Sequence, residues 1–254
     1  ALFEDDVTGS IAWAEALAAA GVLSAADTTA IVNALREILE HGRRDPSWVS
    51  GPDEDVHSFV ERQLVDRVGD AGRGLHTGRS GNEQVSLDLR LYLRRRIGPL
   101  QQAVVKAVTA CADMAEKAGS AMMPSYTHLR RAQPVLVAHF FLSHASALRR
   151  DHARLAIAAN EADSLTLGSG AIAGTSYGVD TALLARKLGF SRVVSNSMDA
   201  SSDRDFVASF LFAVSLGMVH LSRIAEDIII FTGEEHGFFD LAHASGTGSS
   251  IMPQ

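Results

Sequence analysis

The chain contains 254 residues, enough for one large domain or two small domains with a sizeable hydrophobic core. Hydrophobic residues make up 46% of it and charged residues 21%, a balance that excludes disordered and collagen-like proteins. Its 23 basic and 30 acidic residues give a net charge of −7, and the short basic run Arg94-Arg95-Arg96 is insufficient for a nucleic-acid interface. No apolar run approaches the ~20 residues of a membrane span, and the single cysteine, Cys111, cannot form an internal disulfide. We therefore expect a cytoplasmic protein that binds neither nucleic acid nor membranes.

The first third of the chain is predicted to form three helices. Abundant alanine and an aromatic content of only 6% favour helices over strands. Apolar residues recur at helical spacing over residues 11–20 and 25–40, with Ser24 placed to cap the second helix and Gly42 placed to end it. A third helix with one buried stripe is predicted over residues 53–68, and the glycine-rich stretch that follows it predicts a loop.

The rest of the chain is predicted to contain longer helices. In chain order, they cover residues 82–117, 134–160, 179–188 and 199–231. We expect Gly98-Pro99 to kink or interrupt the first, Pro134 to occupy the first turn of the second, and Gly189 to end the third. Residues 118–131 are predicted to form a loop, and the last helix is apolar on several sides, so other helices should surround it. Without sustained two-residue alternation, the sequence predicts an all-α bundle of long helices joined by glycine-rich loops.

Common motifs for cofactors and metals are absent from this sequence. Residues 168–174 are glycine-rich but lack the dinucleotide-binding spacing, and no Gly-Lys-Ser/Thr phosphate loop occurs. His139, His144 and His152 are spaced so that they do not share one helix face as metal ligands. We therefore expect neither a cofactor nor a metal.

Three polar segments are richer in hydroxyl, amide and imidazole groups than a helical bundle needs for its turns. They are residues 76–84 (HTGRSGNEQ), 125–134 (SYTHLRRAQP) and 245–254 (SGTGSSIMPQ). Each lies beside glycines or a predicted helix start, where backbone N–H groups can bind an anion. Any one of them alone also fits an ordinary capping loop, so the functional interpretation depends on their combination.

In their order along the chain and in their amino-acid sequences, the three segments resemble the signature regions of the fumarase/aspartase superfamily, and within it those of the argininosuccinate lyases. Further similar segments are residues 53–57 (DEDVH), 68–72 (VGDAG), 167–175 (LGSGAIAGT) and 196–206 (NSMDASSDRDF). The resemblance runs nearly end to end and implies an all-α, long-helix bundle of the fumarase/aspartase type. It implies that residues 1–75 are part of an N-terminal helical domain and that residues 76–254 are a central long-helix bundle domain, incomplete at its C-terminus.

The resemblance also implies a reaction and an assembly. The reaction is a reversible β-elimination that splits argininosuccinate into arginine and fumarate through an aci-carboxylate intermediate, without a cofactor, in arginine biosynthesis. The assembly is a homotetramer in which loops from three subunits form each active site. Two alternatives stay open: a non-catalytic helical scaffold or silent paralogue, and a sister lyase that releases fumarate from another substrate.

The resemblance implies roles for individual residues. Ser249 would be the base that removes the substrate proton, and it needs neighbouring cations and N–H dipoles because a serine hydroxyl is a very weak acid. His128 would be the general acid toward the leaving nitrogen, directly or through water. Thr127, Ser80 and Asn82 match positions that bind substrate carboxylates.

Arg204 is a weaker candidate for substrate binding. It lies near the start of the longest predicted helix. A structural ion pair with Asp203 or Asp205 explains it equally well.

The chain departs from the family pattern in two places that carry weight, and Glu83 in place of the commoner aspartate is a milder change. The family has an arginine where this chain has Gly81, which removes a bidentate carboxylate donor unless Arg79 or Arg73 replaces it. Family members also begin before Ala1 and continue after Gln254, so the chain resembles the central part of a subunit that is truncated at both ends. The groups expected to activate the base would lie beyond that end.

Overall fold

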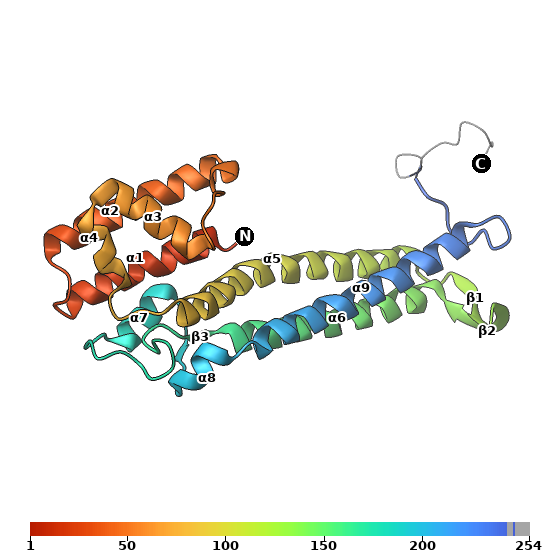
Figure 1. Ribbon diagram of the computed structural model, residues 1–254. Coiled ribbons are helices and arrows are strands. Elements are labelled where there is room, and N and C mark those ends of the chain that lie inside the picture. Colours follow the sequence, from red (N-terminus) through yellow and green to blue (C-terminus); the bar gives the residue numbers. More distant parts are fainter. Residues whose placement is uncertain (243–245, 247–254) are drawn as a thin grey trace. The chain divides into compact units, whose positions relative to one another are not determined.

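The computed structural model describes residues 1–242 and residue 246 of the chain (Figure 1). This described part is predominantly α-helical with two short two-stranded sheets, which confirms the predicted class of long helices. It divides into two compact units. Unit 1 comprises Ala1–Pro99 and Ala156–Phe210, and unit 2 comprises Leu100–Leu155 and Leu211–Gln254. The predicted domain division after residue 75 stays a prediction.

Unit 1 begins with helices that surround one hydrophobic core. The side chains of Trp13, Leu17, Ile31, Leu35 and Leu64 are fully buried in it, and each such burial stabilises the fold by about 1.5–3 kcal/mol. The elements are α1 (Phe3–Ala19), α2 (Ala25–Arg44), the 3-10 helix η1 (Pro46–Trp48), α3 (Val56–Val68), α4 (Asp70–Arg73), the 3-10 helix η2 (Gly74–His76) and the first part of α5 (Gly81–Ala118). The three predicted helices are present, but α1 begins at Phe3, well before the predicted start at residue 11, and the stretch predicted as a loop after them contains α4 and η2.

The two ends of α2 show one correct prediction and one wrong prediction. Ser24 caps the helix as predicted, because its hydroxyl accepts the backbone N–H of Asp27 at 3.0 Å. Gly42 does not end the helix, which continues to Arg44. A Cβ at Gly42 would lie 2.3 Å from Cε1 of Phe3, so close packing against that ring explains the glycine.

The second stretch of unit 1 leads from one long helix into the next. Its elements are β3 (Ser164–Leu165), α7 (Thr181–Leu188), β4 (Arg192–Val193), α8 (Ser197–Ser202) and the start of α9 (Asp205–Thr232). β3 and β4 pair in parallel, and α7 ends at Gly189 as predicted, with φ 72°. The single helix predicted from residue 199 is wrong at its start, since extended backbone at Asp203 separates α8 from α9.

Unit 2 contains the remaining parts of the long helices α5, α6 (Val137–Ala162) and α9, and a hairpin of β1 (Met122–Thr127) and β2 (Arg130–Leu136) (Figure 1). α5 continues through Pro99 as one helix, so the predicted interruption is wrong. The hairpin also corrects the predicted loop over 118–131 and the helix start at Pro134, which pairs with Pro124 in the sheet. Prolines cannot donate hydrogen bonds to a sheet, which is why the sequence did not indicate strands here.

Helix α9 has an exposed apolar face within unit 2. Leu211, Phe212, Met218, Val219 and Ile229 are each more than half exposed. By length and composition α9 is able to cross a membrane, which corrects the expectation that no segment approaches such a span. A core helix of a soluble protein can have the same length and composition.

Candidate functional site

Ser80 and Asn82, the predicted carboxylate-binding residues of the first polar segment, lie together at the start of α5. The hydroxyl of Ser80 accepts the backbone N–H of Asn82 at 3.3 Å, and the carboxylate of Glu83 accepts the backbone N–H of Ser80 at 3.1 Å. This arrangement resembles a capping box, except that the Ser80 hydroxyl accepts from the second helical residue and not from the third, and it fixes the segment to the first turn of the helix. The N-terminus of a 38-residue helix also favours a negatively charged ligand, because its first N–H groups carry partial positive charge.

Gly81 is the first residue of α5 and lies between Ser80 and Asn82 in the sequence. A Cβ added at Gly81 would meet no atom within 4 Å. No close contact therefore requires glycine at this position, and a longer side chain has room beside the two candidate ligand-binding residues.

The two arginines considered as replacements at this position have other partners. The Nε of Arg79 is buried, its Nη1 donates to the hydroxyl of Ser10 at 2.9 Å, and burial lowers the pKa of its guanidinium. Arg73 is exposed and its Nε lies 3.5 Å from the carboxylate of Asp70. The contacts of Arg79 with unit 1 give no support to the hypothesis that it replaces the missing arginine.

Thr127 and His128 lie at the tip of the β1–β2 hairpin in unit 2. Thr127 pairs with Arg130 at the end of the strands, and His128 and Leu129 form the two-residue turn between them. Both turn residues have positive φ, 54° and 56°, a geometry that usually requires Asn or Gly. The side chains of Thr127 and His128 are exposed. Strained turns are common at functional sites, and the implied roles of these two residues stay predictions.

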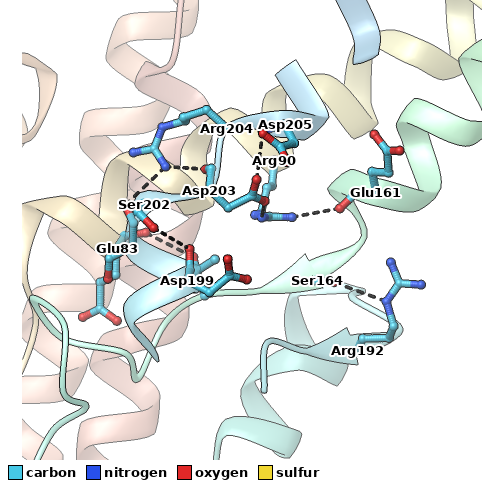
Figure 2. Close-up of polar contacts among 12 residues, drawn as sticks. Glu83, Arg90, Glu161, Ser164, Arg192, Asp199, Ser202, Asp203, Arg204 and Asp205 are labelled. Carbon is cyan, nitrogen blue, oxygen red and sulfur yellow. Dashed lines mark hydrogen bonds and ion pairs between the residues drawn. The ribbon is translucent and has the colours of Figure 1, made fainter. Parts of the chain in front are cut away.

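Arg204 lies between α8 and α9 (Figure 2). Its Nη1 donates to the carbonyl oxygens of Ser201 at 3.3 Å and of Asp203 at 2.6 Å. Neither ion pair predicted for it, with the carboxylate of Asp203 or Asp205, occurs within the described residues. The carboxylate of Asp203 binds Arg90 instead, at 2.6 Å.

Arg90 is a structural residue that the sequence analysis missed. Its guanidinium donates to the carboxylate of Asp203 at 2.6 Å and to the carbonyl of Glu161 at 2.9 Å, and it lies 4.2 Å from the ring centroid of Phe206 (Figure 2). A buried arginine with a paired carboxylate and a stacked ring fixes the segment that leads into α9. The partner aspartate is 113 residues away in the sequence, so no local pattern indicated the pair.

The predicted site residues fall in both units. Unit 1 contains Ser80, Asn82 and Arg204, and unit 2 contains Thr127 and His128. The candidate base Ser249 lies outside the described residues, as does the rest of the third polar segment apart from Gly246. Its assignment as the base stays a prediction.

A buried polar cluster in unit 1 also escaped the sequence analysis. Nδ1 of His57 lies 2.6 Å from Oδ1 of Asp6 and 3.7 Å from Oδ2 of Asp88, and Gln84 donates to Asp6 at 2.7 Å. Burial, and next to it the charge of Asp6, raises the pKa of Asp88 well above its usual range, against the opposing effect of Arg79. Neither carboxylate oxygen of Asp88 has a hydrogen-bond partner among the described residues.

The chemistry of this cluster allows two states. The imidazole and the two carboxylates offer ligand atoms within 4.8 Å of one another, a donor set that a divalent cation accepts. A proton on Asp88 would satisfy the same site without a cation. The guanidinium of Arg79 opposes a proton on Asp88, and it opposes a divalent cation more strongly because that charge is larger.

The variant Asp88→Asn is expected to resist the loss of stability that the parent shows as the pH rises. A carboxyl with a raised folded-state pKa contributes stability below its unfolded pKa and loses that contribution as the pH passes its folded pKa. As the pH is raised from 5 to 8, the thermal midpoint of the variant should therefore rise by about 2–4 °C relative to that of the parent. This shift corresponds to a difference of about 1 kcal/mol in the free energy of unfolding. The exposed Asp66→Asn serves as control. A variant markedly less stable than the parent at pH 8 would instead indicate an ionised Asp88 bound to a cation or donor.

Comparison with known proteins identifies relatives along the whole chain. The family model described as Lyase matches residues 1–254. The argininosuccinate lyases of Roseiflexus castenholzii (strain DSM 13941 / HLO8) and Roseiflexus sp. (strain RS-1) are 47% and 48% identical to this chain over 253 residues. These matches cover 100% of this chain and 56% of each relative, so the chain spans about half the length of the curated relatives it matches.

A solved structure agrees with the fold. The crystal structure of EDDS lyase in complex with formate has a TM-score of 0.90 and 25% sequence identity, over 100% of this chain and 50% of that one. The predicted fumarase/aspartase-type bundle and the resemblance inferred from the three polar segments are both confirmed. With a family match that covers every residue and a capped, anion-favouring helix start at the first signature segment, the chain belongs to the lyase family.

Proposed function

We propose that this chain is part of an argininosuccinate lyase, which splits argininosuccinate into arginine and fumarate by β-elimination. The observation that carries the proposal is the identity of 47% and 48% to two such enzymes across the whole chain. The same observation does not favour the alternative of a non-catalytic scaffold. The acidic charge and the single cysteine agree with a cytoplasmic enzyme.

The start of α5 supports the chemistry that this reaction needs. Removing a proton next to a carboxylate places a second negative charge on that group, and fixed hydrogen-bond donors must stabilise it. A hydroxyl can accept one hydrogen bond and donate another, so Ser80 can bind the N–H of Asn82 and still donate its proton to a substrate carboxylate. The amide of Asn82 and the partial positive charge of the helix start add to the same site.

The remaining roles follow the family resemblance. Ser249 takes the substrate proton, His128 protonates the leaving nitrogen and Thr127 binds a carboxylate. Arg204 is the weakest candidate, because its Nη1 already donates to two backbone carbonyls.

The assembly we propose is a homotetramer whose active sites are shared between subunits. The exposed apolar face of α9 supports association, because a contiguous apolar surface of this kind is normally covered by a partner.

The proposed function predicts which substrate is cleaved. Fumarate release is followed by its ultraviolet absorbance when the protein expressed from its full reading frame is mixed with argininosuccinate, adenylosuccinate or aspartate. We expect release from argininosuccinate alone. Release from one of the other two would show a sister lyase, and release from none would contradict a lyase acting on these substrates.

A further inference from the structure

Glu83 joins two segments of unit 1 that are far apart in the sequence. It lies in the first turn of α5 and its side chain is fully buried. Oε1 accepts the backbone N–H of Ser80 at 3.1 Å, and Oε2 accepts the backbone N–H groups of Gly168 at 2.8 Å and of Gly170 at 3.0 Å. One carboxylate therefore binds both the segment before α5 and the glycine-rich loop after β3.

The glycine-rich loop is shaped to bring its N–H groups to this carboxylate. Gly168 and Gly170 have φ of 102° and 60°, which other residues rarely adopt, and a Cβ at Gly170 would lie 2.5 Å from the carbonyl oxygen of Gly174. The hydroxyl of Thr166 donates to the backbone carbonyl of Glu83 at 3.1 Å. The loop thus holds both the main chain and the side chain of Glu83.

The loop is connected in turn to α8. The hydroxyl of Ser197 donates to the carbonyl of Ile172 at 2.8 Å, and that of Ser201 donates to the carbonyl of Gly170 at 3.4 Å. Burial raises the pKa of Glu83, while the N–H groups that it accepts oppose the rise. Hydrogen bonds to a carboxylate are about twice as strong as neutral ones when it is ionised, so these bonds fix the two segments relative to each other.

We propose that Glu83 is a positioning residue, which holds Ser80 and Asn82 in the geometry that binds a substrate carboxylate by fastening them to the loop at Gly168 and Gly170. This inference rests on the proposed function, because the carboxylate belongs to its substrate or product. Donors act on a developing charge only if they are already in place, and a misplacement of about 1 Å costs on the order of 100-fold in rate. Glu83 does not need to touch the substrate to have this effect.

The test compares two variants of the protein expressed from its full reading frame with one control. Glu83→Gln keeps the size of the side chain but replaces one acceptor oxygen with a donor, and Glu83→Asp keeps the charge but shortens the reach. Glu116→Gln alters an exposed residue on the same helix α5 and is the control. Hydrogen exchange of the amides of Gly168 and Gly170, the Kd of fumarate, and KM and kcat for argininosuccinate are measured for each protein.

We expect Glu83→Gln to exchange these two amides about tenfold faster, and to raise the Kd of fumarate and KM about tenfold, with a smaller effect in Glu83→Asp and with Glu116→Gln unchanged. A packing role alone would leave KM and Kd unchanged in Glu83→Gln, which would overturn the proposal. Unchanged exchange at Gly168 and Gly170 would overturn it as well. Exchange does not depend on catalysis, so a parent protein that neither cleaves argininosuccinate nor binds fumarate refutes the proposed function separately.

Discussion

Replacing Gly81 with arginine is expected to raise kcat/KM for argininosuccinate by about 30-fold or more. The expected gain corresponds to at least about 2 kcal/mol, the lower end of what removing one partner of a buried, hydrogen-bonded charge pair usually costs. The position lies at the start of α5 between Ser80 and Asn82, where an added side chain meets no atom within 4 Å. A guanidinium there can bind a carboxylate with two parallel hydrogen bonds, which neither neighbour can provide.

The contacts of Arg79 support the expected gain in Gly81→Arg. Had that guanidinium been oriented toward Ser80, the chain would already possess a substitute and Gly81→Arg would add little. It donates to Ser10 instead, and its Nε is buried without a hydrogen-bond partner among the described residues.

The matched control for this variant is Gly98→Arg. Gly98 is a second glycine of α5 whose added Cβ would meet no atom within 4 Å, although it is exposed whereas Gly81 is half-buried, and it reports the general effect of a new arginine on the helix. Fumarate release is measured for the parent and both variants. An equal gain in both variants, or no gain in either, would show that Gly81 does not occupy the place of a missing ligand.

The sequence predicted the helices well where local patterns decide the structure. Ser24 and Gly189 act at the ends of α2 and α7 as expected, because capping depends on residues within one or two turns. Gly42 was misread for the opposite reason. A glycine is needed at this position because the ring of Phe3, which is 39 residues away and belongs to another helix, leaves no room for a side chain.

In the candidate site, too, residues in a local motif were predicted and contacts between distant segments were not. Ser80 and Asn82 were predicted from a motif, and the structure adds the hydrogen bonds of the helix cap that hold them. The buried contacts of Glu83, Arg90 and Asp88 were missed, since each connects segments that are far apart in the sequence. Such contacts follow from tertiary packing, and no spacing within a single helix encodes them.

The variant Phe212→Glu is expected to dissociate the assembly and to abolish lyase activity. Phe212 is 62% exposed in one chain, and it lies on the same face of α9 as the exposed Val219, seven residues further along the helix. If copies of this chain cover that face, each new carboxylate is buried among apolar side chains without a partner, which costs several kcal/mol per copy. Because the proposed active sites are shared between subunits, we expect activity to fall at least about 100-fold together with the loss of the tetramer.

Sedimentation velocity and fumarate release, measured on the same samples, test this prediction. Met198→Glu is the control. Met198 is also 62% exposed, but it lies on α8 in unit 1 and is not part of α9. The control should keep the mass of the parent, whereas Phe212→Glu should sediment as smaller species. If Phe212→Glu keeps both mass and activity, copies of this chain do not cover the α9 face. Flotation of the parent with lipid vesicles would then test the remaining explanation for a long apolar helix, since only a membrane-bound α9 would carry the protein upward with the lipid.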